Sequence, residues 1–446
     1  MNETCEVAAF VAATRYEDVP PELIDEFKVL VLDALAAGFV GSHQPWSRAV
    51  NELVRELEGA PQATVIGQLW RADVARAAFA NGTMIGAFEC EPLTGSHAAG
   101  TVFPAALALA EHHHLPGREL LLALVVGAEL SARIMRAATG LESDRGFHNP
   151  GTQGPLGAAG AAGKLLTLDE RGLVNALGIA GSAASGLGEF AWEGADTKRI
   201  HLGRASQLGL ESALLAAKGL TGPSTVLEGR FGYFNAFSLP GADLEGLVDG
   251  LGERWAVRPP FHKSFPTHAS HQSVVQAIQD FKAERLQAGQ PFDAGALSAV
   301  TIHGSGRMLE ARHQVRDPDN VMGAQYSLPF AVAVAVARDA SDPLALNDET
   351  VANAVVRAIA RDVALLPAED GVTVTLELAG EQHVLPARPF TGSPQNPMGW
   401  DDVCEKFDRY AAHSIDQAHR RAIIDAVASL EDAPDVAAVA ELVAAR

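Results

Sequence analysis

The stretch "GTQGPLGAAGAAG", residues 151–163, carries a glycine at every third position and alanine in many of the gaps between them. On a helix, such small residues leave a face without side-chain bulk, so that a neighbouring helix backbone can approach closely. Two ligand-binding interpretations of the stretch fail. A phosphate loop requires glycine where Ala158 stands and Ser or Thr where Leu165 stands, and a dinucleotide loop requires a preceding strand, which the pattern does not show. We therefore predict a buried helix that packs closely against other helices.

Helical patterns extend on both sides of this stretch. After a helix-start signal at Pro20 and Pro21, apolar residues recur between residues 23 and 35 at the spacing of a helix with one buried face. Comparable patterns cover residues 72–88, 103–114, 117–135, 171–184 and 206–220. The alternation typical of strands is almost absent before residue 240.

The pattern changes after about residue 258. Residues 297–306, "LSAVTIHGSG", alternate like a strand, and residues 371–387, "GVTVTLELAGEQHVLPA", read as two strands around a turn. Helical patterns return after Pro397. We predict a mainly α protein with a large all-helical domain, residues 1–263 and 401–446, and an inserted smaller α+β lid domain, residues 264–400.

Composition limits the partners. A chain of 446 residues that is 48% hydrophobic and 20% charged can bury a large core. Its net charge of −21 repels phosphate backbones and anionic lipids, so we expect neither a nucleic-acid nor a membrane partner. The amino terminus shows no secretory signal, and three cysteines far apart in the sequence suit a reducing compartment. We expect a cytoplasmic protein.

Residues 86–100, "GAFECEPLTGSHAAG", place Glu89, Cys90, Glu91 and His97 within nine positions. Such a group could bind a metal, react through its thiol or transfer protons. No third metal ligand follows at a recognisable spacing, and Cys90 has no evident activating partner. Acid/base chemistry is the interpretation that remains, with a polar loop as the alternative.

Two histidine clusters were weighed as metal sites. The adjacent histidines at residues 112–114 point in different directions around a helix and cannot converge on one ion. His268 and His271 have a spacing that allows two zinc ligands, but no carboxylate or thiolate stands nearby at a recognisable spacing. We predict no metal site.

Lysine is rare in this chain, because only seven of the 34 basic residues are lysine. Lys198 and Lys263 lie in polar segments that read as loops, where a lysine can hold a carboxylate or lose its proton when partly buried. The alternative is that both are ordinary surface residues. Four histidines stand next to Gly, Pro or polar turns, and histidine moves protons readily near neutral pH. They are His97, His148, His201 and His268. Together these residues indicate acid/base chemistry on a small anionic molecule.

Several motifs occur in the order found in the MmgE/PrpD family, which this chain resembles over nearly its whole length. They are "NALGIAGSAASGL" (175–187), "DTKRIHLGRASQLGLESALLAAKGLTGP" (196–223), "VLEGRFGYF" (226–234), "KSFPTHASHQ" (263–272) and "YSLPFAVA" (326–333). The family includes 2-methylcitrate dehydratases, cis-aconitate decarboxylases and an iminodisuccinate epimerase. The resemblance implies a homodimer and a cofactor-free active site between a helical domain and a lid. It also implies that the substrates are small di- or tricarboxylates, which lose or exchange a proton or a carboxyl group in that site.

The resemblance also implies the residues of the site. The implied catalytic residues are His97, His148, Lys198, Lys263, His268 and Tyr326. Substrate-binding roles fall to Glu89, Glu91, Lys198 and Lys263.

One run departs from the family pattern. Dehydratases and decarboxylases of the family carry a run resembling D-F-D-D-T, which here reads "AFECE", residues 87–91. Added carboxylate length at Glu89 and Glu91 would repel a third substrate carboxylate, which favours a smaller substrate with a nitrogen that these acids could bind. We therefore expect a cofactor-independent epimerase acting on an iminodisuccinate-like dicarboxylate. In that hypothesis Lys198 and Lys263 hold carboxylates, while His97 and His148, or His148 and Lys263, exchange the proton. The alternatives are a lyase of the dehydratase or decarboxylase type and a non-catalytic dicarboxylate binder.

Overall fold

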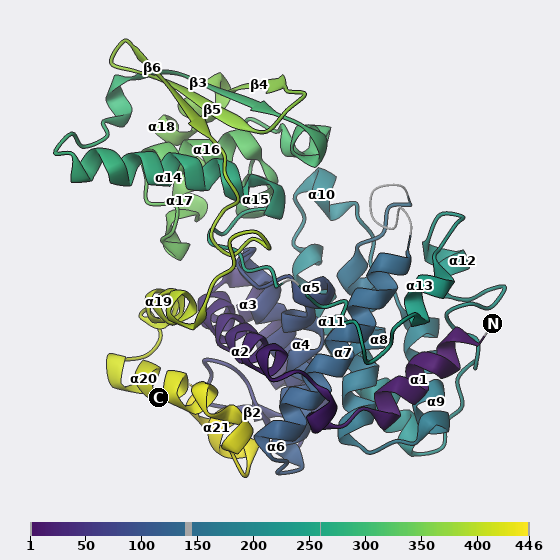
Figure 1. Cartoon of the computed structure of the whole chain (residues 1–446). Coiled ribbons are helices and arrows are strands. Elements are labelled where there is room, and N and C mark those ends of the chain that lie inside the picture. The colour runs from purple at the N-terminus through teal and green to yellow at the C-terminus, as the bar shows by residue number, and fades with distance from the viewer. Residues whose placement is uncertain (1, 139–144, 259, 445–446) are drawn as a thin grey trace. The chain divides into compact units, whose positions relative to one another are not determined.

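The computed structural model describes residues 2–138, 145–258 and 260–444, which divide into two compact units (Figure 1). The first unit comprises Met1–Gly188, Thr197–His262 and Gly399–Arg446, and the second comprises Glu189–Asp196 and Lys263–Met398. Most of the described chain is helical, which confirms the predicted mainly α class. Nothing in the hydrophobic pattern singles out the short segment Glu189–Asp196 as part of the second unit.

Three long helices form the centre of the first unit, namely α7 (Gly117–Ala137), α8 (Asn149–Leu165) and α11 (Thr197–Ala217). The glycine-rich stretch lies on α8, and its small residues allow the close approach that the sequence predicts. A Cβ atom at Gly157 would lie 2.0 Å from Oγ of Ser131 and 2.7 Å from the carbonyl oxygen of Gly127, both on α7. Glycine at Gly157 is therefore required by the packing of α8 against α7.

Other helices surround these three. They are α1 (Glu3–Ala13), α2 (Pro21–Ser42), α3 (Pro45–Glu56), α4 (Val74–Ile85), α5 (Thr94–Thr101), α6 (Phe103–His112), α9 (Glu170–Ala183), α12 (Tyr233–Phe237), α13 (Leu244–Val248), α19 (Trp400–Ala411), α20 (Gln417–Ala428) and α21 (Val436–Leu442). The unit also contains one short antiparallel pair of strands, β1 (Ala63–Thr64) and β2 (Arg71–Ala72). The carboxyl-terminal helix α19 packs against α2, so both ends of the chain contribute to one unit. Within the described residues, no helix is long and apolar enough to cross a membrane.

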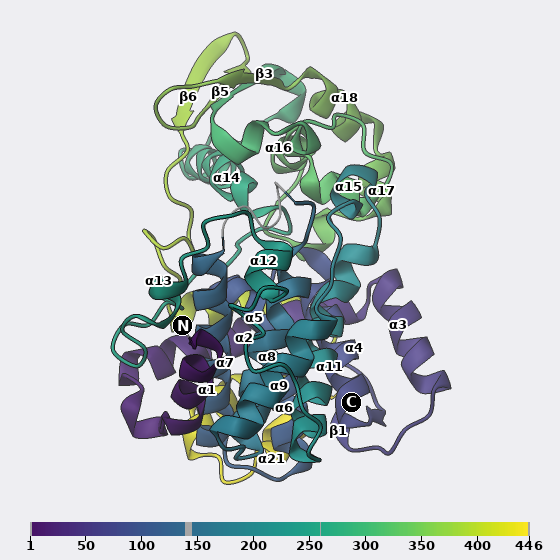
Figure 2. The ribbon, with the colours of Figure 1, turned by 90° about the vertical axis from the view of Figure 1, so that its right-hand side faces the viewer.

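The second unit is built on a four-stranded sheet (Figure 2). Its strands are β3 (Leu297–Gly304), β4 (Ala364–Pro367), β5 (Thr373–Leu378) and β6 (Glu381–Pro386), in the order β4-β3-β5-β6. Only the β3–β4 pair is parallel. The predicted strands at residues 297–306 and 371–387 are confirmed. Ala379 and Gly380 both have positive φ angles, 53° and 84°, as a two-residue hairpin turn requires.

Helices cover one face of this sheet and close its core. Val300, Ile302 and Val374 on the strands pack with apolar residues of α14 (Gln272–Gln287) and α16 (Leu328–Ala337). The unit's other helices are α10 (Phe190–Glu193), α15 (Val321–Tyr326), α17 (Asp348–Ala352) and α18 (Ala354–Asp362). The second unit is therefore an α+β structure with its own hydrophobic core.

Candidate functional site

The segment that leads into α5 has an unusual backbone. Glu89 adopts a left-handed conformation with a φ of 58°, and Gly95, Ser96 and His97 follow with φ values of 57°, 55° and 63°. Each non-glycine residue in this conformation costs about 1–2 kcal/mol. The surrounding structure must therefore hold the segment in place, and it fixes the direction of the Glu89 and His97 side chains.

A buried ionic network in the first unit supplies part of that support. Lys406 on α19 donates to the carbonyl oxygen of Cys90 at 2.8 Å and lies 2.5 Å from Oδ1 of Asp33 on α2. The other oxygen of Asp33 lies 2.7 Å from Nδ1 of His262. Burial acts to raise the pKa of Asp33, but Lys406 and His262 together hold it below its ordinary value. The sequence gives no sign of this network, because its three residues come from distant segments and share no motif.

Two buried acids of this segment contact cationic or titratable side chains. Oε1 of Glu91 lies 2.9 Å from Nδ1 of His97, and the carboxylate of Glu89 pairs with the ammonium of Lys198. The side chains of Glu89, Glu91 and Lys198 are nearly inaccessible, whereas that of His97 is 16% exposed. The prediction that Lys198 lies in a loop is wrong, since it stands in the first turn of α11. Its burial among helices explains why an acid is its partner.

A pair of histidines completes this group. His148, directly before α8, places its Nδ1 atom 2.9 Å from Nδ1 of His201 on α11. The rings of His148 and His97 have centroids 6.3 Å apart. Burial, together with the positive charge of Lys198, lowers the pKa of His201 to about 4. His201 is therefore neutral at neutral pH, and one of the two facing nitrogens carries the shared proton.

The first unit thus brings together five of the residues that the resemblance implies, and adds His201 as a sixth. The five are Glu89, Glu91, His97, His148 and Lys198. Lys198 and His201 are three positions apart on α11 and so share one face of that helix. That spacing would have been visible in the sequence if the helix had been predicted to begin at Thr197.

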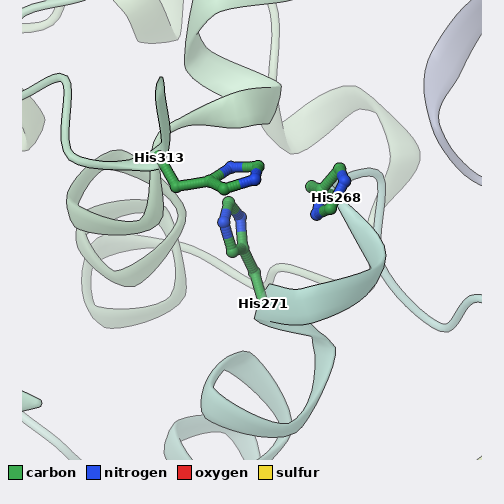
Figure 3. Close-up of side chains that lie close together, drawn as sticks. All are labelled: His268, His271 and His313. Carbon is green, nitrogen blue, oxygen red and sulfur yellow. The ribbon is translucent and has the colours of Figure 1, made fainter. Parts of the chain in front are cut away.

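The remaining implied residues, Lys263, His268 and Tyr326, belong to the second unit. The rings of His268 and Tyr326 have centroids 5.1 Å apart, and the ring of His313 lies 4.4 Å from that of His268 (Figure 3). Burial lowers the pKa of His268 well below its ordinary value, and it lowers that of His313 to about 4. These rings are therefore neutral at neutral pH. Lys263 is buried as well. The sequence carries no signal for His313.

This arrangement suits proton transfer on an anionic molecule. The first unit presents a lysine ammonium, an imidazole held by a carboxylate and a hydrogen-bonded pair of imidazoles, which can bind carboxylates and move protons. Glu89 contacts Lys198 and Glu91 contacts His97 directly, so each acid holds its partner in a defined orientation.

Comparison with known proteins gives a consistent result. Residues 5–245 match the model of the MmgE/PrpD N-terminal domain, and residues 265–432 match that of the MmgE/PrpD C-terminal domain. A cis-aconitate decarboxylase-like protein, oryM of Aspergillus oryzae, is 27% identical over 99% of this chain and 97% of its own length. The cis-aconitate decarboxylase of Mus musculus is 25% identical over 98% of this chain and 92% of its own length. The cis-aconitate decarboxylase of Homo sapiens is 28% identical over 94% of this chain and 90% of its own length.

Proposed function

The chain belongs to the MmgE/PrpD family, and from that premise we propose that it is a lyase of the cis-aconitate decarboxylase type. Such an enzyme releases carbon dioxide from a small unsaturated tricarboxylate. The observation that carries the proposal is that Lys198, His97 and His148 lie together in one buried site. Relatives named cis-aconitate decarboxylase or cis-aconitate decarboxylase-like match this chain over almost their whole length. The epimerase expected from the sequence is unconfirmed, and the lyase alternative has the better support.

The proposed reaction sets clear demands on the protein. The carbon–carbon bond to the leaving carboxylate breaks, and its electron pair forms a new double bond. The original double bond moves its electron pair toward a second carboxylate, and the far carbon takes up a proton. Positive charge near the remaining carboxylates stabilises the intermediate, and a positioned acid supplies the proton.

The first unit offers a group for each demand. We assign Lys198 to bind a substrate carboxylate and to stabilise the developing charge. His97 donates the proton from Nε2 in its imidazolium form and is left neutral, with its remaining proton on Nδ1, where Glu91 accepts the hydrogen bond and fixes the ring. His148 shares a proton with His201 and is assigned to reload His97 or to bind the substrate. Lys263, His268 and Tyr326 remain proposed catalytic residues on the resemblance alone, with Glu89 and Glu91 proposed for substrate binding.

Deuterium labelling tests the proposal. The protein is incubated with cis-aconitate in deuterated water, and carbon dioxide and the proton spectrum of the product are followed. We expect one carbon dioxide and one deuterium per product molecule, and a His97→Asn variant that folds normally loses turnover by orders of magnitude. Absence of carbon dioxide release above the rate in buffer overturns the proposal.

A substrate panel separates the other activities of the family. Deuterium entering the α-carbon of a chiral amino- or imino-dicarboxylate, without carbon dioxide, indicates an epimerase. Water loss from a hydroxytricarboxylate indicates a dehydratase, and saturable binding without turnover indicates a binder. A homodimer, which we also propose from the resemblance, is tested by sedimentation equilibrium of the full chain.

A further inference from the structure

Three histidines of the second unit converge on one point. His268 precedes and His271 ends the short turn Ala269–His271 ahead of α14, and His313 ends the turn Ala311–His313. One ring nitrogen from each residue lies within 4.8 Å of the others. Figure 3 shows the three imidazoles gathered around a common centre. His271 and His313 are fully buried.

Hydrogen bonds fix which nitrogen of His313 carries the proton. Nδ1 of His313 lies 2.8 Å from the carbonyl oxygen of Tyr326. A carbonyl oxygen only accepts, so Nδ1 is the donor and, in the neutral ring, Nε2 carries a lone pair.

The same argument applies to His271 through Thr267. The Thr267 hydroxyl donates to the carbonyl oxygen of Gln325 at 3.0 Å, so its oxygen accepts from Nδ1 of His271 at 3.1 Å. Nε2 of His271 therefore also carries a lone pair. Among the residues that the structure describes, neither Nε2 atom has a hydrogen-bond partner, and both are inaccessible. Two buried lone pairs without a donor are unfavourable unless a cation, a proton or a water molecule lies between them.

His268 can supply the third lone pair. Its Nδ1 lies 2.9 Å from the Ser270 hydroxyl and 3.3 Å from the Ser270 backbone N–H. With the backbone N–H donating, Nε2 carries the proton. When Nδ1 instead donates to the Ser270 hydroxyl, Nε2 becomes a lone-pair donor. A change of tautomer at His268 thus accompanies occupation of the site.

We propose that His268, His271 and His313 bind one late first-row divalent metal ion, for which Zn²⁺ is the model. Neutral imidazole is a preferred ligand of such ions, and three histidines with an open fourth position are a known zinc arrangement. Zinc–nitrogen bonds of about 2.0–2.1 Å need ligand nitrogens about 3.4 Å apart in a tetrahedron. The ring nitrogens lie within 4.8 Å of one another, so they must move closer when an ion binds. The Tyr326 carbonyl and the Thr267 hydroxyl hold two of the rings by their other nitrogens.

The charge of the site sets the fourth ligand. The three ligands are neutral, and two cations, Lys263 and Arg312, act on His268, of which Arg312 is paired with Glu310 at 2.9 Å. A bound divalent ion would keep its full positive charge and take a water, hydroxide or carboxylate oxygen in the fourth position. An ion bound there would also remove the His268 imidazole from proton transfer. That last consequence rests on the proposed function, whereas metal binding itself does not.

The test measures metal binding without substrate. Tag-free full-length protein is stripped with a chelator and titrated with Co²⁺, followed by visible absorption, and then with Zn²⁺ against a chromophoric chelator. We expect one ion per chain, with intense four- or five-coordinate Co²⁺ bands that Zn²⁺ abolishes. His271→Gln and His313→Gln each weaken binding at least tenfold, whereas the matched control His303→Gln, on β3, leaves it unchanged.

A second measurement covers variants that fail to fold. X-ray absorption of the zinc-loaded wild-type protein counts imidazole ligands directly, and we expect three. Absent binding, fewer than two imidazole ligands, or wild-type affinity in folded His271→Gln and His313→Gln variants overturns the proposal. None of these readouts depends on turnover, so they remain valid even if the proposed decarboxylation fails its own test.

Discussion

Replacing Gly209 with alanine tests how the small-residue face of α8 holds α11. A Cβ atom at Gly209 would lie 2.4 Å from Cβ of Ala158, 2.5 Å from the carbonyl oxygen of Pro155 and 2.7 Å from the backbone nitrogen of Ala159. Side-chain rotation cannot relieve these contacts, because two involve backbone atoms and the third involves a Cβ atom. The two helices must move apart instead.

Two opposing effects decide the stability of this variant. Alanine in a helix interior is favoured over glycine by about 1 kcal/mol, whereas overpacking a core costs about 1–3 kcal/mol. Because all three contacts at Gly209 are shorter than 3 Å, we expect the upper end of that cost and a net loss of about 2 kcal/mol. Gly160→Ala is the matched control on α8. Its Cβ atom would first meet the flexible Leu130 side chain at 3.1 Å, so we expect a gain of up to about 1 kcal/mol.

Urea unfolding followed by far-ultraviolet circular dichroism measures both variants. We expect the midpoint of Gly209→Ala to fall below the wild type and that of Gly160→Ala to equal or exceed it. Because α11 also carries Lys198 and His201, turnover of Gly209→Ala should fall even where the variant is fully folded. Equal stability of Gly209→Ala and Gly160→Ala would refute the argument that backbone contacts at α8 position α11.

Three further predictions concern charged groups. Glu91→Gln keeps the shape of the side chain but removes the charge that holds His97. We expect turnover about 10- to 100-fold lower with little change in KM, because the ring is held less firmly. The carbon dioxide assay measures both constants. Lys406→Met leaves the buried Asp33 without its main counter-charge and should lower the free energy of unfolding in urea by about 3–5 kcal/mol. Adding Asp33→Asn should restore part of that free energy. Strictly additive changes in the free energy of unfolding would contradict the pairing. The pKa of His201 is lowered from 6.5 to about 4 on folding, so the unfolded state binds more protons and stability falls as pH drops from 6.5 toward 4. In the His201→Asn variant, stability should depend less on pH, and urea midpoints measured between pH 4 and 6.5 will show the difference.

The fold follows from the sequence where buried faces are apolar. The helical pattern identified α2, α4, α6, α7 and α9 but not α14, and the alternation of residues 297–306 identified β3. The start of α11 was missed because its first turn buries charged residues, Lys198 at 1% and Arg199 at 0% exposure. Pattern analysis assumes that buried faces are apolar, so it assigned this turn to a loop.

The site was predictable only where a family motif marks it. Glu89, His97 and Lys198 were found through motifs, and the structure brings them into one unit. His313 and the Asp33–Lys406 pair carry no motif, because their partners come from distant parts of the chain and only tertiary packing brings them together. Local sequence contains no information on such contacts.

Pairing within the run at residues 87–91 changes the argument drawn from its sequence. By sequence alone, Glu89 and Glu91 are negative charges that would repel a third substrate carboxylate. In the structure the carboxylate of Glu89 pairs with Lys198, and Glu91 lies 2.9 Å from His97. The Glu89 carboxylate, in close contact with the Lys198 ammonium, acts on a distant charge mainly as a dipole, whose field falls off faster than that of a lone charge. Repulsion of a tricarboxylate by Glu89 is therefore weaker than the sequence suggested, which weakens the physical objection to the proposed decarboxylase. The departure from D-F-D-D-T therefore bears on how Lys198 and His97 are held, since Glu89 and Glu91 are their partners.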